Sequence, residues 1–226
     1  YVGKTDPELK AVFVLTSVEY AHYLLLLDTK SQQEAKRVLE LECQPITTEL
    51  SGLSPSIICA FNRVMAELCK AEGRFDDYYE HVCVFLELVK EYDISDEAVF
   101  ADAVMARDFM VSGLLSQKGY NFGQLLSFES VLSRCQDPSL LLTIKTFQSG
   151  DITVQLPHIT DPLLSNNNII THKRKLMALT VTLTKYHQQG HKLVPMAALA
   201  DHLQISDASE AERLLLDALA LDLFDG

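Results

Sequence analysis

The chain has 226 residues, of which 48% are hydrophobic, 8% aromatic and 22% charged. That composition supports a large buried core and excludes an intrinsically disordered or collagen-like chain. A formal net charge of −12 opposes binding to a polyanion such as DNA or RNA, and no apolar run approaches the roughly 20 residues that span a bilayer.

The first seventy residues carry the start and stop signals of three helices. Pro7 follows Asp6, an acidic cap with proline at the first helical turn, and a long stretch without glycine or proline comes after it. Ser31 and Glu34 have the spacing of a capping box, and Pro45 is expected to end the segment that they begin. The predicted helices span residues 7–28, 32–43 and 55–71.

Residues 66–79 predict a helical hairpin. Gly73 lies between two apolar helical patterns and can take the left-handed conformation that ends the first helix, while Asp76 or Asp77 is expected to cap the returning one. A fifth helix is expected to begin at Ser95. Antiparallel pairs of this kind, with short turns and no strand signals, predict a tetratricopeptide-like helical-repeat arm, although no strict 34-residue period of that repeat class is present.

Short apolar pieces follow between residues 119 and 135 and predict helices of one or two turns. Asp137 and Pro138 then begin a longer helix that ends at Gly150. Residues 151–168 are rich in proline and asparagine and are the most loop-like part of the chain. We therefore predict a mainly α protein with a helical-repeat arm over residues 1–165 and a second module over residues 166–226.

The second module has the element order of a winged helix. A long helix is predicted over residues 169–188, and a short extended piece follows at 192–194. Pro195 opens the next helix, and Asp207 with Glu210 caps the last one, in which Leu214, Leu215, Ala218 and Leu219 are expected to be buried. Residues 221–226 are then expected to form the first wing strand, with the returning strand missing from this chain.

Winged helices often bind DNA, and the charges test this alternative. Residues 171–195 carry five basic and no acidic side chains, which can be a solvated helix face or a nucleic-acid contact. The would-be recognition helix, residues 207–222, has Arg213 as its only cation among five acidic residues. Because phosphate binding depends on cations, we predict no nucleic-acid partner.

The sequence contains no motif that calls for catalysis or a cofactor. It has no glycine-rich phosphate loop, no paired-cysteine zinc signature and no G-x-S-x-G turn. His187 and His191 are four residues apart, but two ligands beside a helix-ending glycine fall short of a usual metal site. The five cysteines form an odd set without C-x-x-C spacing, which indicates reduced thiols inside the cell rather than disulfides.

Two segments resemble PCI-domain proteins, and among them the subunits of the proteasome lid. The first is Gly119-Tyr-Asn-Phe-Gly-Gln-Leu-Leu126, and the second is Thr146-Phe-Gln-Ser-Gly-Asp151 at the end of a predicted helix. The Tyr78-Tyr79 pair and the turn at Ile205 are also similar to this family. The likeness extends from about residue 7 to residue 226 and is loosest in the first 50 residues.

The resemblance implies a non-catalytic scaffold subunit of the lid of the 26S proteasome regulatory particle, acting in ubiquitin-dependent protein degradation in the cytoplasm and nucleus. It implies other PCI subunits as partners of the winged-helix module, and a ubiquitin receptor subunit near the helical arm. A PCI subunit of the COP9 signalosome or of a translation initiation factor stays open as an alternative, and so does, more remotely, a winged-helix nucleic-acid-binding protein.

An unpaired strand edge in the winged-helix module would be a site for β-strand addition by a neighbouring subunit. The candidate interface residues are Leu193, Val194, Leu221, Leu223 and Phe224.

Overall fold

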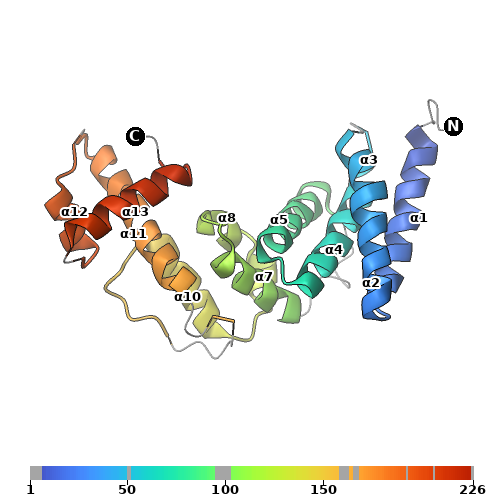
Figure 1. Cartoon of the computed structure of the whole chain (residues 1–226), viewed down its shortest axis with the longest axis horizontal. Helices are drawn as coiled ribbons and strands as arrows, with labels where there is room; N and C mark the ends of the chain where they lie inside the picture. Colours follow the sequence, from blue (N-terminus) through green and yellow to red (C-terminus); the bar gives the residue numbers. More distant parts are fainter. Residues whose placement is uncertain are drawn as a thin grey trace. The chain divides into compact units, whose positions relative to one another are not determined.

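A computed structural model describes residues 7–49, 52–94, 103–157, 163–164, 168–191, 193–205 and 207–224. Throughout these ranges the regular secondary structure is helical and no β-strand occurs (Figure 1). Contacts between residues divide the chain into two compact units, residues 1–100 and residues 101–226. The predicted division between arm and C-terminal module, near residue 165, falls inside the second unit and stays a prediction.

Helices of the first unit pack around an apolar core. The core residues come from α1 (Pro7–Leu25), from the π-helix η1 (Arg37–Cys43) and from α4 (Pro55–Glu72), and include Val14, Val18, Leu39, Val64 and Leu68. The elements are α1 (Pro7–Leu25), α2 (Thr29–Lys36), the π-helix η1 (Arg37–Cys43), α3 (Gln44–Glu49), α4 (Pro55–Glu72) and α5 (Phe75–Tyr92).

The hairpin between α4 and α5 confirms the prediction at Gly73. This glycine has φ +70°, and the amide of Arg74 bonds the carbonyl of Cys69 across the turn. An Asp76 or Asp77 cap is not observed, because the residue that precedes α5 is Arg74 and no side chain caps that end. Asp77 instead accepts a hydrogen bond from Arg74.

The helix predicted over residues 32–43 begins earlier and ends later in the structure than the sequence indicates. Its cap is Asp28, whose carboxylate accepts a bond from the amide of Ser31, so the helix begins before the expected capping box. Its other end passes through Pro45, because η1 widens the helix and the amide of Gln44 bonds the carbonyl of Leu39, five residues back. In a widened turn of this kind, the ring of a following proline avoids the clash with the backbone carbonyl of the preceding turn that it would have in a regular α-helix.

The second unit is built from short and long helices in the predicted order. The start expected at Ser95 lies outside the described residues, whereas the short helices, the cap at Asp137 and the stop at Gly150 are confirmed. The elements are α7 (Ala103–Leu115), α8 (Phe122–Leu126), α9 (Glu129–Leu132), α10 (Pro138–Ser149), α11 (Asn168–Gln188), α12 (Met196–His202) and α13 (Ala208–Ala220).

Position 150 requires a left-handed backbone and leaves no room for a side chain, and glycine suits both conditions better than any other amino acid. The φ of Gly150, +66°, is left-handed, and a Cβ added there would lie 2.6 Å from the Cβ of Val181 in α11. The glycine therefore lets the end of α10 approach α11 closely. This is a physical reason for the glycine in the segment 146–151.

The predicted wing strand is wrong for residues 221–224. Asp222 takes a left-handed φ of +52°, and the amide of Leu223 turns back to bond the carbonyl of Ala218. This six-to-one bond is a Schellman stop, which closes α13 and returns Leu223 to the core. Residues 193 and 194 are not a strand either, and residues 192, 225 and 226 lie outside the described residues.

The last three helices share a core of their own. Leu176, Leu179, Leu199, Leu203 and Leu214 are buried together, as the helical spacing predicts. Leu219, in contrast, is 37% exposed, so α13 is rotated slightly from its predicted face.

Candidate protein-interaction surface

The structure separates the five predicted interface residues into two groups. Val194, Leu223 and Phe224 are partly buried and pack against the core of α11, α12 and α13. Leu193 is 88% exposed and Leu221 is 39% exposed. None of the five lies in a β-strand, so the strand edge proposed from the sequence is not the feature that they share.

Leu221 lines a groove between the start of α11 and the end of α13. The groove has a volume of about 510 Å³, and Tyr120 from the α7–α8 connection contributes to its wall. Ile169 and Leu221 supply apolar surface, and His172 Nε2 lies 3.4 Å from Asp217 Oδ2. A shallow apolar groove with an ionisable pair suits an inserted side chain of a partner better than a reacting substrate.

Lys173 fixes one wall of the groove from within. Its side chain is 1% exposed, and Nζ donates to the carbonyls of Gly113 at 2.8 Å and Ser116 at 2.5 Å. The ammonium also lies 4.8 Å from the ring centre of Tyr120 and 5.3 Å from that of Phe122. A cation at the negative end of α7, beside two aromatic faces, holds α11 against that helix.

The other cations near Lys173 are also engaged within the second unit. Arg174 donates to the backbone carbonyls of Asp151, Ile152 and Val154. Lys175 forms an ion pair with Glu210 of α13 at 2.5 Å. The expected solvated basic face is therefore wrong for Lys173, and these three charges stabilise the packing of α11 instead of forming a phosphate-binding row.

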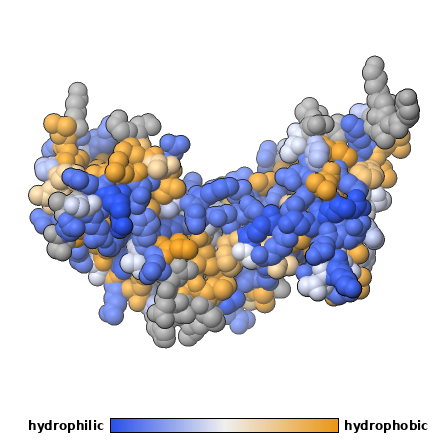
Figure 2. All heavy atoms as spheres, in the orientation of Figure 1, coloured by the Kyte–Doolittle hydropathy of each residue, from blue (hydrophilic) through white to orange (hydrophobic). Residues whose placement is uncertain are grey.

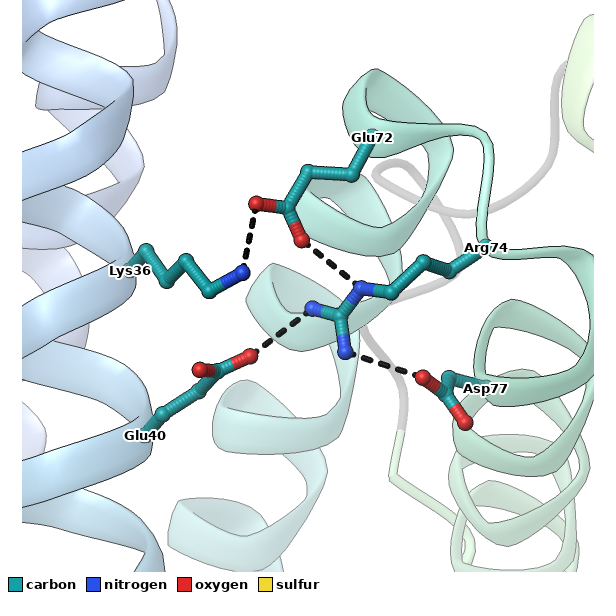
Figure 3. Close-up of polar contacts among 5 residues, drawn as sticks. All are labelled: Lys36, Glu40, Glu72, Arg74 and Asp77. Atoms are coloured by element: carbon teal, nitrogen blue, oxygen red, sulfur yellow. Dashed lines mark hydrogen bonds and ion pairs between the residues drawn. The ribbon is translucent and has the colours of Figure 1, made fainter.

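In the first unit, Arg74 connects three carboxylates at the α4–α5 turn (Figure 3). Its guanidinium lies 2.9 Å from Glu40, 2.7 Å from Glu72 and 2.9 Å from Asp77. Glu72 also pairs with Lys36 at 2.9 Å. Because Glu40 lies on η1 and Lys36 on α2, this network ties the hairpin to the preceding helix and gives the first unit a fixed geometry.

Three of the five cysteines are poor nucleophiles. Burial raises the pKa of Cys43 and Cys83 to about 11 and that of Cys69 to about 12, so these thiols stay protonated at neutral pH. They fill the core of the first unit.

Metal-binding clusters are not found among the described residues. No group of three histidine, cysteine, aspartate or glutamate side chains there could hold a metal ion. His191 packs its ring against Tyr186, with centroids 5.6 Å apart, and His187 is exposed. None of the helices in the described ranges is long and apolar enough to cross a membrane.

The family described as PSD13 N-terminal repeats matches residues 3–142, more than half of the chain. The chain belongs to this family. The match covers α1 to α9 and reaches into α10, and it therefore includes the segment Gly119–Leu126 that resembled proteasome lid subunits. The sequence resemblance is confirmed.

Curated relatives extend the similarity beyond the repeats. The chain is 23% identical over 221 residues to "26S proteasome non-ATPase regulatory subunit 13 homolog A" of Arabidopsis thaliana, with 92% of this chain and 55% of that protein covered. It is 22% identical over 225 residues to homolog B of the same plant, with 94% and 56% covered. The chain thus spans a little over half the length of these PSD13 relatives.

Proposed function

We propose that this chain is a non-catalytic scaffold subunit of the lid of the 26S proteasome regulatory particle and supports ubiquitin-dependent protein degradation. The observation that carries the proposal is the match to PSD13 repeats over residues 3–142, together with two relatives named as 26S proteasome non-ATPase regulatory subunits. The site itself agrees with this role, since the surface offers a shallow groove and exposed leucines.

In this proposal the helices α11, α12 and α13 are the helical part of a PCI winged-helix module. Their order and shared core support this assignment. The module binds another PCI subunit through Leu193 and through the groove at Leu221, while a ubiquitin receptor subunit contacts the helical arm. The subunit works in the cytoplasm and nucleus, where its relatives' complex would place it.

Affinity purification of the tagged full chain from its native cells tests the proposal. We expect the other lid subunits in near-stoichiometric amounts by mass spectrometry. Recovery of COP9 signalosome or translation initiation factor subunits instead, or of no complex at all, would overturn the assignment.

A substitution at Leu193 tests the interface. Leu193→Asp changes a side chain that is 88% exposed, so the module keeps its core while an apolar contact is lost. The matched control is Leu142→Asp on α10, where the leucine is 50% exposed. We expect lid recovery to fall at least tenfold for Leu193→Asp and to be unchanged for Leu142→Asp; equal recovery of both would exclude Leu193 from the interface.

A further inference from the structure

The outward side of α1 exposes an unusual amount of apolar surface. Val14, Val18, Ala21 and Leu24 face the core of the first unit. The opposite side carries large hydrophobic residues that are 40% or more exposed, and Figure 2 shows hydrophobic atoms at the surface where α1 lies. These residues are Leu9, Val12, Phe13, Leu15, Tyr20 and Tyr23, and Leu26 and Leu27 follow them in the turn after α1.

Their spacing forms a continuous seam. Leu9, Phe13, Thr16, Tyr20, Tyr23 and Leu27 follow one another at intervals of four, three, four, three and four residues. We call this set the α1 seam. Intervals that alternate between three and four are those with which one α-helix packs along another. The part of the seam that lies on α1, from Leu9 to Tyr23, extends about 21 Å at 1.5 Å per residue.

Thr16, the one polar member of the seam, does not interrupt it. Its hydroxyl donates to the carbonyls of Val12 at 2.9 Å and Phe13 at 3.0 Å within the same helix. The hydroxyl is therefore satisfied within the helix and needs no polar group from a partner. An exposed apolar seam of this length has the character of a covered face.

The charges beside the α1 seam favour some binding partners over others. Glu19 is exposed beside the midpoint of the seam, and no described residue forms an ion pair with it. A second copy packed antiparallel about this midpoint would bring the two Glu19 carboxylates to the same edge, where they repel. A lipid surface is disfavoured too, because Glu8 and Glu19 flank the seam, whereas helices that bind anionic lipids carry lysine and arginine there.

We propose that the α1 seam is a docking surface for an amphipathic α-helix of a partner protein, which lays its own apolar stripe along the seam and places a lysine or arginine opposite Glu19. This surface is separate from the groove at Leu221. The inference therefore does not depend on the proposed role in the lid, and each can fail without the other.

Binding of a designed peptide to the full chain tests the inference. The probe is a helical peptide of 21 residues with leucines at intervals of three and four and one lysine at its centre, and a second peptide carries glutamate at that position. The centre of the peptide meets the middle of the seam whichever way the peptide runs, so a central side chain on its apolar stripe lies near Glu19. We expect the lysine peptide to bind roughly threefold more tightly than the glutamate peptide, as for an ion pair at a rim, and the variant Glu19→Lys to reverse this order.

Loss of the apolar contact gives the larger effect. Tyr23→Asp alters a residue that is 65% exposed, so the helix stays folded while peptide affinity falls at least tenfold. Leu41→Asp, at a leucine 71% exposed on η1 and outside the seam, is the matched control and leaves affinity unchanged. Circular dichroism melting verifies that both variants fold.

Three results would overturn the inference. The first is a peptide affinity that neither Tyr23→Asp nor Glu19→Lys changes, or the absence of any peptide binding. The second is self-association of the chain in sedimentation velocity that Tyr23→Asp abolishes, which would make a second copy the occupant. The third is co-flotation with phosphatidylcholine–phosphatidylserine vesicles that depends on the seam.

Discussion

Lys173 Nζ donates a 2.8 Å hydrogen bond to the carbonyl of Gly113, sixty residues earlier in the chain. The bond joins α11 to the end of α7, where the unpaired carbonyls of a helix terminus need donors. The buried lysine supplies such a donor to the carbonyls of both Gly113 and Ser116. One buried charged side chain thus contributes directly to the packing of α11 on α7.

Replacing Lys173 by methionine should destabilise the second unit. Methionine keeps most of the volume but leaves the carbonyls of Gly113 and Ser116 without this donor, which costs about 2 kcal/mol of unfolding free energy. Urea unfolding followed by circular dichroism measures the change. Lys185→Met, at an exposed position on the same helix, is the control and should unfold like the unchanged chain; equal stability of both variants would show that the buried ammonium contributes nothing net.

A second prediction concerns the close approach at Gly150. Gly150→Ala must take a left-handed φ and place a Cβ 2.6 Å from that of Val181. Gly73→Ala must also take a left-handed φ, +70°, but has no atom within 4 Å of the new Cβ. We expect Gly73→Ala to cost about 1 kcal/mol and Gly150→Ala about 2 kcal/mol more, from overpacking. Thermal unfolding of both variants separates the cost of the strained backbone from the cost of the clash with Val181. Equal losses of stability would mean that α10 and α11 can move apart freely.

Helix positions were largely predictable from sequence because caps, prolines and glycines are local signals. Asp137, Pro138 and Gly150 bound α10 as predicted. The helix stop at residues 221–224 was not predictable in this way. Leu221 and Leu223 alternate with the polar Asp222 as in a strand, and the stop depends on this aspartate, a left-handed residue that is not glycine. The π-turn before Pro45 was equally hidden, because proline normally ends a helix.

The groove depends on contacts far apart in sequence, so local patterns could not assemble it. Tyr120, Ile169 and Leu221 meet only after folding. One signal for Lys173 was present: Ile170 and Met177, three residues before it and four after it, are buried on the same face of α11. A lysine within an apolar stripe at helical spacing can be recognised as buried.

The network around Arg74 should contribute more than its exposure suggests. Arg74→Met removes the cation shared by Glu40, Glu72 and Asp77 and leaves three carboxylates close together, so we expect a loss of about 1 to 2 kcal/mol. The loss should shrink in 1 M NaCl, where exposed charges are screened. Arg37→Met is the control, because Arg37 pairs with Glu34 and Glu42 at a more exposed site, and it should destabilise the chain less. A larger effect at Arg37 would contradict the role assigned to Arg74.

His81 should make the first unit less stable in mild acid. Its ring N–H donates to Asn62 Oδ1 at 2.8 Å, and burial lowers the pKa of His81 below its usual 6.5, although Asp77 and Glu80 nearby act in the opposite direction and Arg74 adds to the lowering. The unfolded chain therefore binds this proton more readily than the folded one, so stability is retained above about pH 6.5 and falls as the pH drops below it. Urea unfolding of the full chain at pH 7.5, 6.5 and 5.5 should show a shallower decline for His81→Gln than for the unchanged chain, while His187→Gln, at an exposed ring without these contacts, keeps the original decline. If His81→Gln declined as steeply as the unchanged chain, the proton would be taken up elsewhere.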